Sequence, residues 1–341
     1  MIRDVLERLL AGESLPAGAT EECFTALMAG EWSEPEQAAF LVALRAKGET
    51  STEVAAAARV LRSFAVAVPA SRTPLVDTCG TGGDGAHTLN ISTGAALVAA
   101  ACGVGVAKHG NRSVSSKCGS ADVLEALGVP LDLEPDQLAA LLDSEGFAFL
   151  FAPRLHPAMR AVMPVRRALG VRTVFNLLGP LANPAGVRRQ VVGVYNRAAM
   201  PLVAGALAEL EAERAWVVHG EDGLDELSVC APTRVIEVRD ARVVGELTVD
   251  PRDFGIPRAA RSDLAGGDAP ENARRLRAIL AGSERSPAAD AVALNAAAAL
   301  LVAGAAPDLA TGFAASRACL AEGRAAAKLD AVIRRIREIR G

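Results

Sequence analysis

Apolar residues recur every three or four positions through the first 66 residues, and this spacing predicts amphipathic helices. Phe40, Leu41 and Leu44 show the repeat. Residues 33–36 and 50–53 each place a Ser or Thr three positions before a Glu, the pattern of a capping box at a helix start. We therefore expect four helices in this part of the chain.

From Leu75 onward, short apolar runs alternate with helical patterns. The expected strands are Leu75–Thr78, Val104–Ala107, Phe147–Phe151, Gln190–Tyr195 and Ala215–His219. The expected helices between them are Gly94–Cys102, Val123–Leu127, Pro135–Ser144 and Pro201–Glu211. Such alternation is typical of a parallel sheet with helices on both faces, so the pattern predicts an α/β domain.

Three segments depart from this alternation. Arg234–Val238 and Arg242–Val249 are predicted to form a hairpin that extends the sheet. Residues 272–340 are predicted to be helical, with breaks at glycines that include Gly312. Residues 163–184 are basic at first and then rich in Gly, Pro and Asn, and alone they predict only a long loop, which in a compact domain is often functional.

The composition allows a large core but no strong global charge. Hydrophobic residues make up 51% of the 341 positions and aromatic residues only 4%, which favours close helix packing on small side chains. Lys and Arg number 36 against 40 Asp and Glu, for a net charge of −4. Because such a chain as a whole does not attract nucleic acid, an anionic ligand would have to be held by local groups.

The cysteines and the apolar stretches indicate a cellular location. The six cysteines are scattered without a C-x-x-C spacing, so we expect reduced thiols in a cytoplasmic protein. The first residues combine acidic side chains with a short apolar stretch, unlike a signal peptide. The Ala-rich stretches are too weakly apolar to predict a membrane-spanning helix.

The strongest chemical signal is a pair of loops after two consecutive strands. Residues 77–85, DTCGTGGDG, contain glycines that can adopt positive φ and present backbone N–H groups to a ligand. Ser92 or Thr93 is the expected N-cap of the next helix, whose N-terminus favours an anion. Residues 108–112, KHGNR, follow the second strand and supply positive charge at the same sheet edge. The sequence therefore predicts a phosphate site.

Two common phosphate-binding motifs do not fit. Residues 80–85 match G-x-G-x-x-G, but the next helix begins roughly ten residues later than the dinucleotide fingerprint requires, and the second strand ends in Lys108 rather than an acid. No G-x-x-x-x-G-K-[ST] sequence occurs, so a P-loop NTPase is not predicted. Ligand-free turns alone would not account for three such motifs within about forty residues.

Taken in order, these motifs resemble the anthranilate phosphoribosyltransferase family of tryptophan biosynthesis. The resemblance begins with GTGGD at 80–84, N-x-S-T at 90–93, KHGNR at 108–112 and SVSSKCGSAD at 113–122. It continues with VRRALG at 165–170, RTVFNLLGPLANP at 172–184, HGEDGLDELS at 219–228 and GGDAPENA at 266–273. It covers essentially the whole chain, and the order and spacing of the segments make it specific.

The resemblance implies a fold like that of nucleoside phosphorylases and phosphoribosyltransferases. This fold is a small helical N-terminal domain plus a large α/β domain with a mostly parallel central sheet. The helical domain would comprise residues 1–69 joined by about 164–186, and the large domain residues 70–163 and 187–341. A homodimer formed through the N-terminal helices is also expected, since Ala-rich helices can pack closely across a two-fold axis.

The resemblance also implies a reaction, the transfer of a phosphoribosyl group from 5-phosphoribosyl diphosphate (PRPP) to the amine of anthranilate. The residues implied for PRPP come from the two loops and from the start of the helix between them. They are Gly80, Gly83, Asp84, Thr88, Asn90, Ile91, Ser92, Thr93, Lys108, His109, Gly110, Asn111, Arg112, Ser113, Val114, Ser115, Ser116 and Ser120.

Two further groups of residues are implied for the acceptor and for a metal. The residues implied for anthranilate are Gly80, Asn111 and Arg166, of which the arginine has the fork geometry that suits a carboxylate. The residues implied for Mg²⁺ are Ser92, Asp225 and Glu226, whose oxygen atoms suit a hard cation. Without the family, the arginine and the two acids would be taken for solvated surface charges.

No strong base is evident for the amine. His109 is the only histidine in the central motif and is a candidate to accept a proton or to position the acceptor. A structural histidine in a tight glycine loop is an equal alternative. We therefore leave the catalytic residue unassigned, with His109 as its candidate.

Two other functions stay open at this point. A pyrimidine nucleoside phosphorylase has a similar architecture, but its glycine loop carries K-x-S-T-G-G, and residues 77–83 of this chain lack that lysine. A non-catalytic nucleic-acid-binding paralogue would need a long basic face, whereas this chain is mildly acidic and keeps Asn111 and Arg166. We therefore expect small-molecule substrates, with neither nucleic acid nor membrane as a partner.

Overall fold

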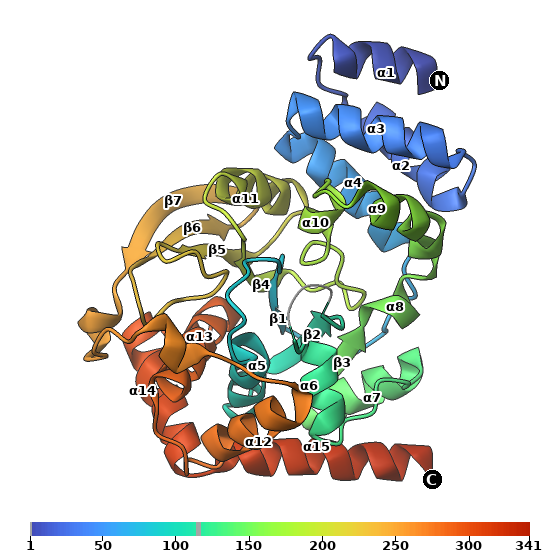
Figure 1. Cartoon of the computed structure of the whole chain (residues 1–341). Coiled ribbons are helices and arrows are strands. Elements are labelled where there is room, and N and C mark those ends of the chain that lie inside the picture. The colour runs from blue at the N-terminus through green and yellow to red at the C-terminus, as the bar shows by residue number, and fades with distance from the viewer. Residues whose placement is uncertain (1, 114–116) are drawn as a thin grey trace.

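The N-terminal part of the chain is a helical bundle (Figure 1). The structure is a computed structural model that describes residues 2–113 and 117–341. The bundle consists of α1 (Ile2–Leu10), α2 (Ala17–Ala29), α3 (Glu34–Lys47) and α4 (Ser51–Ser63). Both predicted capping boxes are present, because the Ser33 N–H donates to Glu36 at 2.9 Å and the Thr50 N–H donates to Glu53 at 2.8 Å. The expectation of four helices is confirmed.

One seven-stranded sheet forms the centre of the α/β part, in the order β3-β2-β1-β4-β5-β6-β7. Its parallel strands are β1 (Leu75–Gly80), β2 (Gly105–Gly110), β3 (Phe147–Phe151), β4 (Arg189–Gly193) and β5 (Arg214–Gly220). The antiparallel strands are β6 (Thr233–Arg239) and β7 (Arg242–Val249). The predicted parallel sheet and hairpin are confirmed. Parallel pairing brings the carboxyl ends of the first five strands to one edge, where ligands bind.

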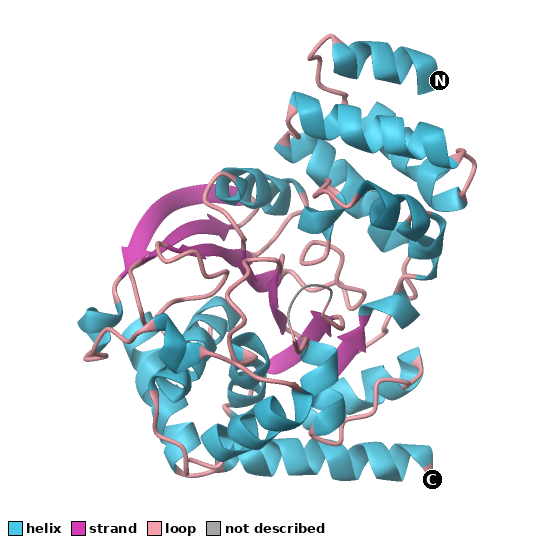
Figure 2. Ribbon diagram, viewed as in Figure 1, coloured by secondary structure: helices cyan, strands magenta, loops and turns pink. Residues whose placement is uncertain are grey.

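Helices cover both faces of the sheet (Figure 2). On one face α5 (Ile91–Ala101) and α13 (Pro287–Ala303) contact β1, and on the other α11 (Ala199–Glu209) lies between β5 and α4. The other helices of the α/β part are α6 (Ser120–Ala126), α7 (Pro135–Glu145), α8 (Ala152–Leu155), α12 (Ala269–Leu280), α14 (Leu309–Ala321) and α15 (Arg324–Arg340). The described residues also form the short 3₁₀ helices η1 (Pro157–Ala161), η2 (Pro251–Phe254) and η3 (Arg261–Leu264).

Alternate residues of the central strands enter two separate cores. In β5, Trp216 and Val218 belong to the core with α5 and α13, whereas Val217 belongs to the core with α11 and the bundle. This is the two-sided burial expected of a parallel sheet. The predicted helix break at Gly312 is wrong: Gly312 lies inside α14, where the missing side chain lets the helix approach the Ala297 backbone of α13.

Residues 163–184 contain short helices in addition to loops. They form α9 (Met163–Leu169) and α10 (Phe175–Leu178), which lie beside the bundle in Figure 1. The Phe175 ring packs edge-on against Phe24 of α2, with 5.9 Å between ring centroids. This packing supports the predicted discontinuous helical domain, whose boundaries stay a prediction. Within the described residues, no helix is both long and apolar enough to cross a membrane.

Candidate active site

The loop after β1 exposes backbone donors. Gly82, Gly83 and Gly85 have φ between +65° and +76°, a conformation that glycine adopts without strain. In the part of the chain that the structure describes, the N–H groups of Gly83, Asp84 and Gly85 form no hydrogen bond. Successive free N–H groups on such a turn form an anion-binding concavity. The loop therefore has the donors that the sequence predicted.

Helix α5 begins earlier than expected. Asn90 occupies the N-cap position in place of Ser92 or Thr93. Its side chain does not cap the helix, because its amide donates to the Cys118 carbonyl at 3.2 Å and its oxygen accepts from Asn272 at 3.0 Å. Asn90 therefore joins the start of α5 to the GGDAPENA segment and to the end of the second loop.

The predicted phosphate ligands around this helix start differ in exposure. Ile91 and Thr93 are buried, and the Thr93 hydroxyl has no hydrogen-bond partner among the described residues. Thr88 forms an isolated β-bridge with Ala265. Ser92, by contrast, is only partly buried. Of the two hydroxyls expected at the helix start, only that of Ser92 lies at the surface.

Asp225 and Glu226 lie on the turn after β5 and reach both anion-binding elements. Asp225 accepts the Gly82 N–H at 3.0 Å, and Glu226 accepts the Ser92 N–H at 2.9 Å. Both residues are partly buried, so they are not the solvated surface acids that the local sequence would suggest without the family. Burial, with the nearby Asp84 carboxyl as the next cause, raises the pKa of Asp225 to about 7. Burial and the neighbouring Asp225 raise the pKa of Glu226 well above its ordinary value.

These acids fit a hard cation. Ser92, Asp225 and Glu226 line one small cavity of about 20 Å³, so the structure brings the three predicted metal ligands together. No group of three or more His, Cys, Asp or Glu side chains among the described residues is arranged to hold a metal by itself. Two carboxylates that leave the remaining positions to water and phosphate oxygens match the usual binding of Mg²⁺.

The acidic turn comes close to the sheet because two strands end in glycine. A Cβ at Gly193, the last residue of β4, would overlap the Asp225 carbonyl, and one at Gly80 would overlap the Asp225 carboxylate. Asn295 of α13 holds the turn from the other side, since it accepts the Leu227 N–H at 2.9 Å and donates to the Leu227 carbonyl at 2.8 Å. Asn295 was not predicted from the sequence, where its only signal is its place within an apolar helix.

Lys108 is a strand residue beneath the site. β2 includes Lys108 and His109, which the sequence analysis placed after the strand. The Lys108 ammonium is buried and donates to the Thr78 carbonyl at 2.5 Å and to the Ser92 hydroxyl at 3.4 Å. The buried ammonium therefore links the end of β1 to the start of α5 through these two hydrogen bonds.

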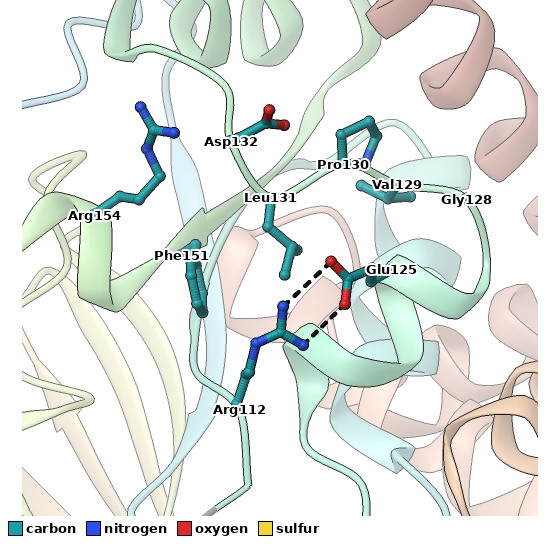
Figure 3. Close-up of a pocket in the computed structure, with 9 residues that line it drawn as sticks. All are labelled: Arg112, Glu125, Gly128, Val129, Pro130, Leu131, Asp132, Phe151 and Arg154. Atoms are coloured by element: carbon teal, nitrogen blue, oxygen red, sulfur yellow. Dashed lines mark hydrogen bonds and ion pairs between the residues drawn. The ribbon is translucent and has the colours of Figure 1, made fainter.

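Arg112 points toward a different cavity (Figure 3). Its guanidinium pairs with Asp122 at 2.8 Å and Glu125 at 2.9 Å, and it lies 5.8 Å from the centroid of the Phe151 ring. Arg112, Glu125 and Phe151 line a cavity of about 600 Å³ together with Arg154. The structure thus neutralises the Arg112 charge with acids and does not direct it to the small cavity at Asp225.

The rest of the second loop is mostly exposed. Asn111 is exposed, and its side-chain oxygen accepts the Arg112 N–H at 2.7 Å. Gly110 ends β2, Ser113 is partly buried, and the Ser120 hydroxyl donates to the Asn111 carbonyl at 3.2 Å. Three further residues predicted for PRPP, Val114, Ser115 and Ser116, lie outside the described residues.

His109 and His156 form a buried pair. His109 Nδ1 lies 3.1 Å from the Gly179 carbonyl, and the two Nε2 atoms are 3.2 Å apart. Because a carbonyl only accepts, we assign the proton of His109 to Nδ1, so that its Nε2 accepts from His156. Burial, then the neighbouring imidazole, lowers the pKa of His109 to about 3, and burial lowers the pKa of His156 to about 4. This geometry gives His109 no free lone pair and does not favour it as a base.

The free energy of unfolding should depend on pH because of this histidine pair. Because both folded pKa values lie below the ordinary 6.5, the unfolded chain binds more protons than the folded chain between pH 6.5 and about 4, and stability falls as the pH falls. His156→Gln removes one titrating ring and keeps an N–H donor. Over this range the free energy of unfolding of the variant should fall less steeply than that of the parent, and the two slopes should differ by up to about 1.4 kcal/mol per pH unit. Urea titrations measure the difference, and parallel curves would contradict it.

A second buried network joins the segment after α10 to the strand ends. Asp77 accepts the His109 N–H at 3.1 Å and the Asn183 amide at 2.8 Å. Asn183 also donates to the Ala107 carbonyl at 2.8 Å. Burial raises the pKa of Asp77 to about 6, although the Lys108 ammonium opposes the shift. Asp77 and Asn183 had no role in the sequence analysis, because only the fold brings them together.

Arg166 presents a charge without an acidic partner. Its guanidinium carbon lies 5.1 Å from the centroid of the Phe175 ring, and burial lowers its pKa. No acid forms an ion pair with Arg166 in the described ranges. Arg167, the next residue of α9, is exposed. Arg166 is therefore held in place with its charge available to an anionic ligand.

Two models of one enzyme family match the chain. The helical bundle domain of the glycosyl transferase family matches residues 3–65, and the a/b domain of that family matches residues 72–326. The first match covers the bundle, and the second covers all seven strands. The second match includes the glycine loop and the acidic turn of the candidate site.

Several relatives are similar over almost their whole length. The anthranilate phosphoribosyltransferase of Desulfatibacillum aliphaticivorans is 49% identical over 334 residues, 98% of each chain. The solved structure of the enzyme of that name from Thermus thermophilus has a TM-score of 0.93 at 48% identity, covering 98% of this chain and 99% of the other. That from Saccharomyces cerevisiae, in complex with PRPP and Mg, has a TM-score of 0.91 at 26% identity, covering 99% and 98%.

The comparisons agree with the motifs and with the arrangement of the strand ends. Relatives with about 50% sequence identity cover 98% of this chain, which includes the glycine loop and the acidic turn. The solved relatives place the same elements in the same order in space. The chain belongs to the anthranilate phosphoribosyltransferase family.

Proposed function

We propose that this protein transfers the phosphoribosyl group of PRPP to the amine of anthranilate, giving phosphoribosylanthranilate and pyrophosphate in tryptophan biosynthesis. One observation carries the proposal. Asp225 accepts a hydrogen bond from the glycine loop, and Glu226 accepts one from the start of α5, so carboxylates and backbone donors lie together at one sheet edge. A diphosphate accompanied by a divalent cation needs both kinds of group.

The donor would lie on the glycine loop and the start of α5. The free N–H groups of residues 83–85 would donate hydrogen bonds to its phosphate oxygens, and the buried Lys108 ammonium would favour its negative charge. Ser92, Asp225 and Glu226 would hold Mg²⁺, and the structure of the yeast relative in complex with PRPP and Mg supports the use of this cation. When bound, Mg²⁺ would neutralise the charge that develops on the departing pyrophosphate.

The acceptor would lie on the side of α9. Arg166 would bind the anthranilate carboxylate through two parallel hydrogen bonds, with Gly80 and Asn111 beside the ring. The amine lone pair would form the bond to the anomeric carbon as the bond to the pyrophosphate oxygen breaks. His109 would position Gly179 and His156, and the amine proton would pass to water or to the released pyrophosphate.

A substrate panel tests this function against its rivals. The purified protein should consume anthranilate with PRPP and Mg²⁺, and it should release no base from thymidine or uridine with phosphate. Base release without loss of anthranilate would favour the nucleoside phosphorylase. A gel shift with nucleic acid and no PRPP consumption would favour the nucleic-acid-binding paralogue.

We also infer a homodimer formed through the N-terminal helices. Leu10 of α1 is 74% exposed and Val42 of α3 is 44% exposed, and these two helices contact each other. Light scattering should give twice the 35.1 kDa chain mass. Leu10→Asp with Val42→Asp should yield monomers, whereas Val243→Asp on the sheet edge should not. A monomeric parent protein would contradict the inference. The cytoplasmic location stays a prediction.

A further inference from the structure

A second arginine of the segment around α9 and α10 reaches the glycine loop. Arg172 lies between the two helices and donates from Nη2 to the Gly83 carbonyl. Its guanidinium carbon lies 3.9 Å from the centroid of the Tyr195 ring, within range of a cation–π contact. Arg172 forms no ion pair with an acid in the described part of the chain. The Arg172 guanidinium therefore interacts with a backbone carbonyl and an aromatic ring rather than with an acid.

Tyr195 lies just after β4 and contacts the same loop through its backbone. Its N–H donates to the Thr81 hydroxyl at 3.1 Å, and the Thr81 N–H donates to the Gly193 carbonyl at 2.8 Å. The loop is therefore fixed at Thr81 by the end of β4 and at Gly83 by Arg172. Between and beyond these points it consists largely of exposed glycines, which have no side chains to hold it.

The contact at Gly83 determines where the next backbone donor points. In a trans peptide the carbonyl and the following N–H point in opposite directions. Because Arg172 fixes the Gly83 carbonyl, the Asp84 N–H is turned to the other side, where it forms no hydrogen bond with described residues. A Cβ on Gly83 would lie 3.4 Å from Arg172 Nη2, so the guanidinium lies directly against the backbone.

We propose that Arg172 and Tyr195 are positioning residues that clasp the glycine loop and orient its N–H groups toward the diphosphate of the donor. The proposal rests on the proposed function and extends it to residues outside the predicted site. Because Arg172 lies shortly after the end of α9, its hydrogen bond to the Gly83 carbonyl also joins the donor loop to the helix that carries Arg166. The segment that binds the acceptor thereby shapes the donor site.

The test combines hydrogen exchange of the free protein with calorimetric PRPP binding in Mg²⁺. Arg172→Ala should raise amide exchange in residues 81–85 several-fold and raise the PRPP Kd about tenfold, the loss expected for one charge-assisted hydrogen bond. The KM for anthranilate should change by less than about twofold. Arg167→Ala, a nearby exposed arginine, should leave the exchange and both constants as in the parent.

Variants at Tyr195 separate the ring from its hydroxyl. Tyr195→Phe keeps the ring face and should retain a PRPP Kd within about twofold of the parent, whereas Tyr195→Leu should raise it about threefold to tenfold. Unchanged loop exchange and PRPP affinity in Arg172→Ala would overturn the proposal. A parent protein that does not bind PRPP would overturn it together with the proposed function. PRPP binding without transfer to anthranilate would overturn the proposed function alone.

Discussion

Replacing Asp225 by Asn and Glu226 by Gln together is expected to lower turnover by about 100-fold or more and to raise the stability of the metal-free protein. The two carboxylates and Asp84 crowd negative charge into a partly buried space, and the Lys108 ammonium opposes only part of the rise in the pKa of Glu226. The amides remove this repulsion and keep one oxygen each to accept the N–H groups of Gly82 and Ser92. Removal of these charges removes the groups proposed to hold Mg²⁺.

Two measurements check this prediction. Steady-state kinetics over a range of Mg²⁺ concentrations should show a higher Mg²⁺ requirement, and thermal unfolding in a chelator should give a Tm higher by roughly 2 °C or more. Glu221→Gln is the matched control, since Glu221 is an exposed acid near the same turn. A variant that responds to Mg²⁺ like the parent would contradict the metal assignment.

Arg166→Ala is expected to raise the KM for anthranilate about tenfold to hundredfold and to change the KM for PRPP little. Loss of a charge-assisted hydrogen bond costs about 1.5–3 kcal/mol, and the Arg166 charge has no acidic partner within the described residues. The Phe175 ring holds the guanidinium in place. Arg167→Ala should have little effect, because Arg167 projects about 100° around the helix and is exposed.

Initial rates measured with each substrate varied in turn provide the test. Arg166→Lys should recover only part of the affinity, because an ammonium cannot reproduce the paired hydrogen bonds of a guanidinium. Equal losses of anthranilate affinity at positions 166 and 167 would contradict the assignment of Arg166, rather than Arg167, to the side of α9 that faces the acceptor. A larger effect on PRPP than on anthranilate would place the acceptor elsewhere.

The secondary structure was largely predictable because its signals are local. Phe147–Phe151 and Arg242–Val249 were predicted with the bounds that the structure has, since each is an apolar or alternating run ended by turn residues. The start of α5 was misplaced because Asn90 uses its side chain for tertiary hydrogen bonds rather than for capping. Local patterns alone do not decide between these two uses.

The direction of charged side chains was not predictable in the same way. Lys108 is buried and bound to a carbonyl, and Arg112 is neutralised by Asp122 and Glu125, although both were expected to supply positive charge to the loops. The contacts that tie the site together join residues far apart in sequence. Asn183 and Asp77 are separated by 106 positions, and Arg172 and Gly83 by 89. Such pairs arise only from tertiary packing.

The partial burial of Asp225 and Glu226 was also not predictable from the local sequence. Asp225 and Glu226 follow a strand in a polar stretch, which locally favours exposed side chains. They are partly buried because Gly80 and Gly193 leave room for the turn against the strand ends. Gly80 was singled out for the backbone freedom of its loop and Gly193 was not singled out at all, whereas the effect of both here is to allow a close approach.

The most direct measurement of function follows the fluorescence of anthranilate in the presence of the purified protein, PRPP and Mg²⁺, with pyrophosphate counted in the same samples. Fluorescence should fall only when all components are present, and one pyrophosphate should appear for each anthranilate consumed. Arg166→Ala measured in parallel should slow the decay at low anthranilate. Unchanged fluorescence with active, folded protein, or pyrophosphate release that does not depend on anthranilate, would contradict transfer between these two substrates.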